Sequence, residues 1–295
     1  MRRALLFLFA FVCLLVTGCK QAQTLGGKPR TKSYRSIISL SPSTTEILMA
    51  NGIQISGRTS ACNYPEQVKG VPIVATTKPD YEAISRMRPD LIIYDAELYG
   101  EAEIRKLKET GAELFKFDPQ SLDEYITRTY ELGSLIGAET GLSSFLDKVS
   151  AEMTSAKGDP PKPQPTVALI LPGTSGRHLI GGTKGLRAES LKVAGGKQIG
   201  PDSNRFEPLS PEFLVSQDPD CIIVAGDRAT FEKDPRFANL KARRNANVYG
   251  LSQDIVLRRG ARVDQLIANF HKALSLAVEP KPTAAAAGSA SGGTN

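Results

Sequence analysis

Residues 82–93 (EAISRMRPDLII) and residues 212–223 (EFLVSQDPDCII) decide the fold of this chain. Glutamate, proline, aspartate and two isoleucines match between the two stretches at a constant offset of 130 residues. The apolar run 37–40 before Pro42 keeps the same offset from the run 167–170 before Pro172. Self-similarity of this kind is typical of a duplicated structural unit. The sequence therefore predicts two copies of one unit.

Strand and helix patterns alternate within each copy. Helical patterns lie at 82–88 and 101–110, and a last helix is expected over 263–277. Short runs typical of strands recur at 37–40, 53–56, 91–94, 113–117, 166–171, 221–224 and 247–251. Such alternation predicts an α/β fold in which a mainly parallel sheet is covered by helices.

Two capping boxes predict helix starts. Ser43 as the N-cap residue, with Glu46 three positions later, predicts a helix that ends at Gly52. Ser121 with Glu124 predicts a second helix that runs to about residue 135. A longer helix is expected over 139–157, where the apolar residues fall on one face and prolines follow at 160–163.

These patterns divide the chain into segments. We expect an N-terminal α/β lobe at 35–137, a helix between the lobes at 138–160 and a C-terminal α/β lobe at 161–278. Residues 279–295 consist mainly of proline, alanine, glycine and serine, a composition that predicts a disordered tail.

The first residues are typical of an export signal. Arg2 and Arg3 precede an apolar run at 4–16, which is too short for a bilayer span of about 20 residues. The run ends in Val-Thr-Gly-Cys at 16–19, which resembles the bacterial lipoprotein cleavage box and predicts a signal peptide at 1–18 and a lipid on Cys19. An ordinary secretory signal is the alternative. Residues 19–34 then form a flexible basic tether that lets the lipid hold the protein to a membrane.

Composition excludes several classes of protein. The 295 residues are 41% hydrophobic and 23% charged, which excludes wholesale disorder. Removal of residues 1–18 takes two of the 37 basic residues and leaves 35 against 31 acidic ones, so the mature charge of +4 implies no nucleic-acid partner. Two histidines and four cysteines make a zinc module or a multi-histidine metal centre improbable. Cys62 and Cys221 are not expected to form a disulfide.

Glu82 and Glu212 occupy the first turn of matching short helices. Asp80 and Ser210 precede them as predicted N-caps, and a carboxylate at this position is favoured by the helix dipole. The residues alone leave two interpretations open. Each glutamate stabilises a helix start, or the two form a matched pair of acidic contacts for a two-fold partner.

Three blocks together resemble the periplasmic siderophore- and vitamin B12-type substrate-binding proteins of ABC importers. They are residues 35–46 (RSIISLSPSTTE), the segment from Gly57 through Tyr64-Pro65 and Tyr81-Glu82 to 88–92 (RPDLI), and residues 247–249 (NVY) with Asp254 and 258–262 (RRGAR). The resemblance covers about residues 34–277. It implies two pseudo-symmetric α/β lobes joined by a long backbone helix, as in class III periplasmic binding proteins, and a ligand held in the cleft between them.

The resemblance also implies partners and a location. Glu82 and Glu212 match the family's two glutamates that dock onto arginines of the membrane permease, so we expect a permease dimer with its ATPase subunits as the partner. The receptor is expected to be a lipid-anchored monomer on the periplasmic or extracytoplasmic face of the cell envelope.

Five residues are candidates for ligand contact by the same resemblance: Tyr64, Thr77, Arg177, Asp254 and Arg258. A corrinoid is the first expectation, with a ferric siderophore or haem as the alternative, so the ligand is itself a metal chelate and no separate cofactor is expected. The absence of tryptophan departs from the B12-binding branch, because few aromatic residues remain to stack on a flat ligand.

Enzyme function is not expected. The glycine-rich stretches 173–176 and 181–185 match neither the G-x-S-x-G nucleophile elbow nor the phosphate-binding P-loop. Ser175 and His178 are close in sequence, but no third catalytic group is indicated, and a hydrolase therefore ranks below a binding protein. A surface lipoprotein that only binds other proteins is a further alternative.

Overall fold

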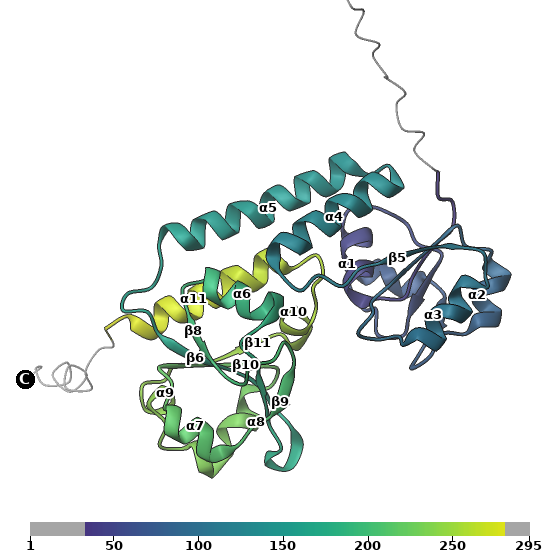
Figure 1. Cartoon of the computed structure of the whole chain (residues 1–295). Helices are drawn as coiled ribbons and strands as arrows, with labels where there is room; N and C mark the ends of the chain where they lie inside the picture. The colour runs from purple at the N-terminus through teal and green to yellow at the C-terminus, as the bar shows by residue number, and fades with distance from the viewer. Residues whose placement is uncertain (1–32, 281–295) are drawn as a thin grey trace, which may run out of the picture. The chain divides into compact units, whose positions relative to one another are not determined.

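The computed structural model describes residues 33–280, which fall within one compact unit (Figure 1). The predicted signal peptide, Cys19, nearly all of the tether and the tail beyond residue 280 lie outside the described residues, so these remain predictions. Within 33–280, no helix combines the length and the apolar character that a membrane span requires.

The first half of the described chain forms a sheet of five parallel strands in the order β3-β2-β1-β4-β5. Parallel pairing places the carboxyl ends of all five strands at one edge, which we call the first carboxyl edge. The strands are β1 (Ile37–Ser39), β2 (Gly57–Thr59), β3 (Ile73–Ala75), β4 (Leu91–Tyr94) and β5 (Glu113–Lys116). The helices of this half are α1 (Pro42–Ala50), the 3₁₀ helix η1 (Glu66–Gly70), α2 (Tyr81–Met87) and α3 (Glu101–Lys108).

The expected strand at 53–56 is wrong by several residues, because β2 begins at Gly57. The Ser56 amide donates to the Ile37 carbonyl at 2.7 Å, so pairing with β1 starts where the predicted strand would end. A Cβ atom on Gly57 would lie 3.0 Å from Val74. The close approach of β3 therefore favours glycine at this point.

The predicted cap of α1 is also wrong. Ser41 is the N-cap residue and accepts from the Thr44 amide at 3.4 Å, and Pro42 occupies the first helical position. Proline is favoured there because it has no amide hydrogen to leave unpaired. Ser43 and Glu46 therefore lie inside the helix, where both side chains are buried.

Two helices connect the halves. In α4 (Leu122–Ile136), the Ser121 hydroxyl accepts from the Glu124 amide at 3.0 Å, as the second capping box predicted, and the left-handed Gly137 ends the helix. The predicted long helix is α5 (Glu139–Gly158). It packs against α4 and against the last helix, α11 (Val263–Val278), and Figure 1 shows it running beside α4.

The second half forms a mixed sheet in the order β11-β10-β6-β7-β9, and β8 also pairs with β6. Here β8, β10 and β11 run parallel to β6, whereas β7 pairs antiparallel with both β6 and β9. The strands are β6 (Thr166–Leu171), β7 (Leu179–Gly181), β8 (Lys197–Ile199), β9 (Phe206–Pro208), β10 (Cys221–Ala225) and β11 (Val248–Leu251). The remaining helices are η2 (Thr174–Gly176), α6 (Gly185–Val193), α7 (Pro211–Gln217), α8 (Arg228–Glu232), η3 (Pro235–Phe237), α9 (Lys241–Arg244) and α10 (Gln253–Leu257).

The predicted duplication holds in register at the central strands and at one helix of each half. Ile38 pairs with Ile92, and their counterparts 130 positions later, Ala168 and Ile222, also pair. Helix α2 and helix α7 are related by the same offset. Both end in a left-handed residue that is not glycine, Arg88 in α2 and Asp218 in α7.

Each sheet is buried on both faces. Ile37 and Ile93 pack into one apolar cluster with residues of α4 and α5, and the alternate residues Ile38 and Ile92 pack into another with Ile84 of α2. In the second sheet, Val167 and Ala168 divide between two clusters in the same way. This alternation explains the continuous apolar runs read in the sequence, because strands of a sheet that is covered on both sides need no polar face.

Candidate functional site

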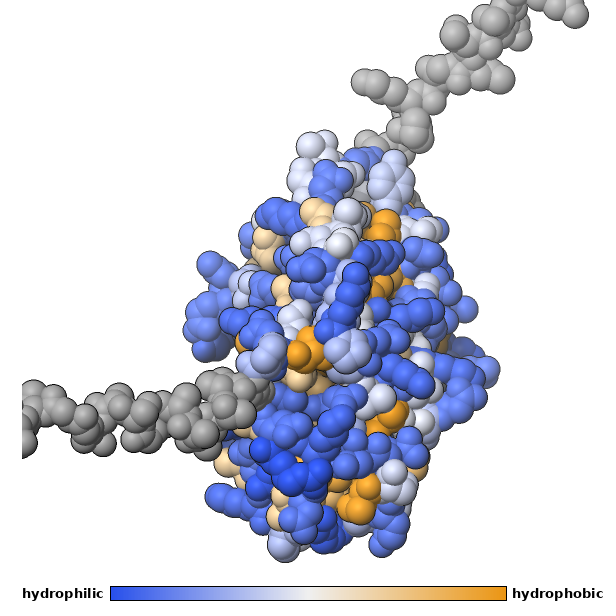
Figure 2. Space-filling model, turned by 90° about the vertical axis from the view of Figure 1, so that its left-hand side faces the viewer, coloured by the Kyte–Doolittle hydropathy of each residue, from blue (hydrophilic) through white to orange (hydrophobic). Residues whose placement is uncertain are grey.

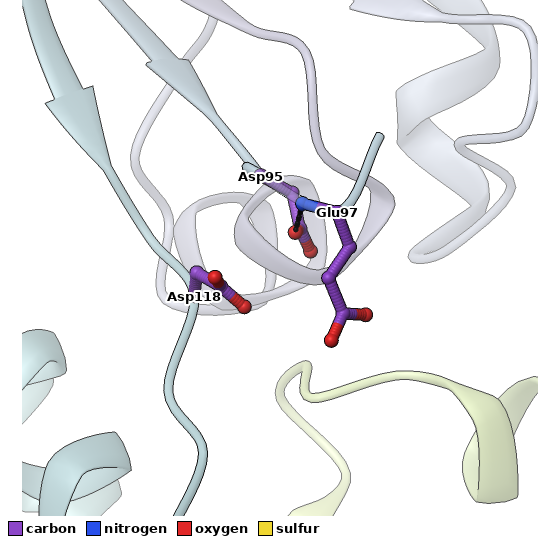
Figure 3. A group of neighbouring side chains, drawn as sticks. All are labelled: Asp95, Glu97 and Asp118. Carbon is purple, nitrogen blue, oxygen red and sulfur yellow. Dashed lines mark hydrogen bonds between the residues drawn. The ribbon is translucent and has the colours of Figure 1, made fainter. Parts of the chain in front are cut away.

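Three acidic residues follow strands at the first carboxyl edge. Asp95 comes directly after β4, Glu97 lies two residues further, and Asp118 follows β5. Their carboxylates surround one small region, with ligating oxygens within 4.8 Å of one another (Figure 3). The Glu97 amide donates to the Asp95 carboxylate at 2.9 Å and fixes the turn after β4.

Arg259 supplies the positive charge for these three carboxylates. Its guanidinium lies 2.6 Å from Asp95, 3.1 Å from Asp118 and 3.4 Å from Glu97. Three clustered carboxylates could also suit a hard divalent cation, but the guanidinium is already bonded among them. Burial raises the pKa of Asp95 even though Arg259 acts in the opposite direction. Burial alone would lower the pKa of Arg259, but Asp95 and the other acids raise it.

Glu46 forms a second charged group with arginines from the far end of the sequence. Its carboxylate is 1% exposed and lies 2.9 Å from the Arg258 Nη1 and 2.6 Å from the Arg262 Nη2. A carboxylate buried this deeply requires opposite charge and hydrogen bonds. Glu46, which the sequence pattern assigned to a capping box, therefore binds arginines more than 200 positions away in the sequence.

The backbone of residues 258–262 also contacts helices α1 and α4. The Arg259 amide donates to the Ser43 hydroxyl at 3.1 Å, and the Tyr125 hydroxyl donates to the Gly260 carbonyl at 2.6 Å. A Cβ atom on Gly260 would collide with the Glu46 carboxylate. Residues 258–262 thus lie against the first carboxyl edge through both their backbone and their side chains.

Three of the five predicted ligand residues lie around this arginine segment. Arg258 donates to the Asn63 Oδ1 at 2.6 Å and pairs with Asp254 at 3.0 Å. Asp254 in turn accepts from the Asn63 Nδ2 at 3.0 Å. The ring of Tyr64 lies 4.4 Å from the Arg262 guanidinium, within cation–π range. An anionic ligand would have to displace existing partners to reach Arg258, which is 13% exposed.

Thr77 and Arg177 are placed differently. Thr77 follows β3 and Arg177 follows η2, and both residues are exposed. Within residues 33–280, no hydrogen bond or ion pair joins either side chain to the arginine segment. They occupy loops beyond the carboxyl ends of β3 and β6, but in the described part of the chain no hydrogen bond or ion pair joins them to the other three.

Glu82 and Glu212 are both exposed in the first turns of α2 and α7. Glu82 pairs with Arg86 one turn later at 2.5 Å. Glu212 accepts from the Ser210 hydroxyl at 2.8 Å. A hydrogen bond from its own backbone amide and the Ser210 hydroxyl lower the pKa of Glu212, so this carboxylate stays ionised in mild acid.

A separate pocket of about 480 Å³ lies beside β6 and contains the residues considered for hydrolysis. His178 is buried there, with its Nδ1 accepting from the Gly173 amide at 3.2 Å and its Nε2 3.3 Å from Asp234. Arg236 holds the same aspartate at 2.5 Å and lowers the pKa of Asp234 to about 2. Both ring nitrogens of His178 thus have a neighbour other than Ser175, and the geometry favours a structural role.

Sequence reasoning missed the acidic cluster. Asp95 and Asp118 each lie within two residues of the end of a buried strand, a position that places a side chain at the carboxyl edge of a parallel sheet. The sequence therefore contained a signal for these two residues.

The face drawn in Figure 2 is mostly hydrophilic, with small separate hydrophobic groups. The large exposed hydrophobic side chains include Leu98, 54% exposed and next to Glu97.

The sequence matches the family model described as "Periplasmic binding protein" over residues 37–255. An uncharacterized ABC transporter substrate-binding lipoprotein of Bacillus subtilis is 26% identical over 246 residues, which are 79% of this chain and 77% of the relative. A vitamin B12-binding protein of Salmonella choleraesuis is 24% identical over 196 residues, 64% of this chain and 72% of the relative.

Solved structures share the fold. The periplasmic haem-binding protein RhuT from a Roseiflexus species, in its apo form, superposes with a TM-score of 0.71 at 25% identity. The superposition covers 84% of this chain and all of RhuT. The two-lobe α/β architecture expected from the sequence is therefore confirmed.

Proposed function

The chain belongs to the periplasmic binding protein family, and from that membership we propose that it is the cargo receptor of an ABC importer. The family consists of binding proteins, so the hydrolase alternative is set aside. In this proposal the receptor binds a corrinoid or another metal chelate between its two lobes and delivers it to a permease dimer that carries ATPase subunits.

One observation supports the proposal: residues 258–262, which belong to the second half, lie against the loops that follow β2, β4 and β5 of the first half. Loops at the carboxyl ends of parallel strands are where α/β proteins bind ligands. Asp254 follows β11, Tyr64 follows β2, and Arg258 connects the two loops through Asn63. Tyr64, Asp254 and Arg258, with Thr77 and Arg177 on neighbouring loops, are the proposed ligand contacts.

A corrinoid is the first candidate cargo because a relative is a vitamin B12-binding protein. Haem is the second candidate, since RhuT binds haem and shares 25% identity. A ferric siderophore is the third, from the resemblance of the sequence motifs. All three are chelates that bring their own metal, so no resident cofactor is required.

Permease docking is proposed for Glu82 and Glu212. The two carboxylates stand at the same position of duplicated helices, and both are exposed. A partner with two-fold symmetry could therefore contact each through the same arginine-rich surface.

Lipid attachment at Cys19 completes the proposal. The Bacillus subtilis relative is a lipoprotein, and the motif at 16–19 resembles a lipoprotein cleavage box. Replacement of Cys19 by serine should release the protein from the membrane fraction and abolish the incorporation of radiolabelled fatty acid. Retention of the serine variant in the membrane would contradict this part.

A binding screen tests the receptor function. The mature chain 19–295 with Cys19→Ser is titrated with cyanocobalamin, haemin and a neutral ferric hydroxamate, and binding is measured by calorimetry and thermal shift. We expect saturable one-to-one binding of one class. Absence of binding for all three would contradict the proposal and favour a lipoprotein that only binds other proteins.

A further inference from the structure

Arg187 stands apart from the arginines described above. It lies in the first turn of α6 and is half-buried. Its Nη2 donates to the Asn204 carbonyl at 2.7 Å, and its guanidinium lies 5.3 Å from the centre of the Phe206 ring. These two contacts hold the guanidinium plane in place.

No carboxylate of residues 33–280 forms an ion pair with Arg187. Arg258, Arg259 and Arg262 each have a carboxylate within 2.9 Å. Burial lowers the pKa of Arg187, and the nearby charge of Arg259 lowers it further, while Glu97 opposes them. A cation withdrawn from water in this way is costly unless a partner compensates it.

The position of Arg187 is at the junction of the two halves. The Asn204 side-chain amide donates to the Gln120 Oε1 at 2.8 Å, and Gln120 follows β5 of the first sheet. The Glu189 carboxylate, also on α6, accepts from the Leu122 amide at 2.6 Å. Helix α6 and the loop that contains Asn204 therefore contact the segment between β5 and α4, and Arg187 lies near enough to Arg259 and Glu97 for their charges to act on it.

The Arg187 guanidinium has two nitrogens that are not used in contacts with the described residues. No hydrogen bond among the described residues uses its Nε or its Nη1. Asp95 and Asp118 are bonded to Arg259, whereas Glu97, at 3.4 Å and 37% exposed, holds it less closely. A guanidinium with free donors and no carboxylate is suited to an oxyanion, which it binds through two hydrogen bonds.

We propose that Arg187 binds an oxyanion, a carboxylate or a phosphate, that the cargo itself carries. The inference rests on the proposed receptor function and narrows its substrate class to chelates with an acidic side group. The Phe206 ring beside the guanidinium offers an apolar surface to the body of such a ligand.

Matched ligands test the role of Arg187. Haemin is compared with its dimethyl ester, and cyanocobalamin with dicyanocobinamide, which lacks the phosphodiester. The variants are Arg187→Met, which keeps the length of the side chain, Arg187→Lys, and the control Arg205→Met, which removes an exposed charge from the adjoining loop. Calorimetry gives affinities, and thermal unfolding verifies that each variant is folded.

We expect Arg187→Met to weaken binding of the acidic ligand by roughly 10- to 100-fold and to leave its neutral counterpart within about 2-fold. Arg187→Lys should retain part of the affinity because the charge persists. Arg205→Met should change neither ligand, because its charge is screened by solvent.

Four outcomes would overturn the inference. Equal loss for the acidic and neutral ligands would mean that Arg187 acts only through packing. An equal effect of Arg205→Met would mean a general electrostatic effect. If inorganic phosphate binds at Arg187 but neither acidic ligand does, the site would be one for free anions. If the wild-type protein binds only the neutral ferric hydroxamate, the inference is contradicted but the receptor function stands. If the wild-type protein binds none of the ligands, the receptor function itself is contradicted.

Discussion

The two halves share a backbone plan but carry opposite charges where they meet. Their central strands pair in the same register 130 residues apart, and α2 matches α7. The first carboxyl edge contributes carboxylates, Glu46 and Asp95 among them, and the second half contributes Arg258, Arg259 and Arg262. Duplication therefore supplied the scaffold, and divergence of the loops made its copies complementary.

The largest expected effect is that of Glu46→Ala. Removal of the carboxylate leaves Arg258 and Arg262, each 13% exposed, without their shared partner. We expect a loss of about 3–5 kcal/mol in the free energy of unfolding. Denaturant unfolding measures it, with Glu131→Ala as the control because the Arg128–Glu131 pair is exposed and worth at most about 1 kcal/mol. Equal losses for the two variants would mean that the opposite charges do not hold the halves together.

Arg259→Met should lower the free energy of unfolding by a smaller amount, about 2–3 kcal/mol at pH 7. The loss is smaller because Asp95 can take up a proton when its cationic partner is removed. Burial already raises the pKa of Asp95 in the folded protein, so the folded state binds more protons and stability falls as pH rises through that pKa. Without Arg259 the pKa rises further. The penalty should therefore be greater at pH 7 than at pH 4, and a penalty independent of pH would contradict this account.

Gly260→Ala should lower the free energy of unfolding by still less, about 1–2 kcal/mol. The added methyl group collides with the Glu46 carboxylate and forces it away from its arginines. Gly141→Ala is the matched control, because Gly141 lies within α5 with open space around it, and alanine there should stabilise the helix slightly. Equal midpoints for the two variants would show that the close approach at Gly260 is unimportant.

The smallest effect on stability is expected for the docking pair. Glu82→Ala with Glu212→Ala should leave the unfolding midpoint and the cargo affinity unchanged, because both side chains are exposed. Permease-dependent uptake should nevertheless be lost. Glu109→Ala with Glu139→Ala removes the same charge outside α2 and α7 and serves as the control. Loss of cargo affinity with normal uptake would contradict the docking proposal.

The two docking helices also differ in a way that can be measured. Glu82 forms an ion pair with Arg86, whereas within residues 33–280 Glu212 accepts hydrogen bonds from the Ser210 hydroxyl and its own amide and is influenced by the charge of Arg236 without an ion pair. We expect Arg86→Ala to release Glu82 and to increase permease binding slightly. A decrease would mean that Arg86 itself contacts the permease.

The fold was largely readable from the sequence, because its determinants are local or periodic. The 130-residue offset gave the two copies, and Ser121 and Gly137 gave the limits of α4. The errors at α1 combine a local and a distant cause. Ser43 and Glu46 fit the local capping rule, but Ser41 and Pro42 start the helix earlier, and the partners of Glu46 lie 212 and 216 residues away.

The candidate site was predicted less well for the same reason. Asp254, Arg258 and Tyr64 came from a family resemblance, whereas Glu97 and Arg187 carry no pattern in their neighbourhood of the sequence. Their roles depend on which charges the fold brings near them, and a half-buried arginine without an ion-paired carboxylate is recognisable only in three dimensions.

Burial of Glu46 has a consequence for the order in which the protein assembles. The first half can form its strands early, yet it retains a carboxylate without counter-charge until residues 258–262 arrive. A nascent or truncated chain that stops before residue 258 should therefore populate an expanded, proteolysis-sensitive intermediate. The first quarter of the polypeptide would therefore reach its native structure only after the final quarter has been synthesised.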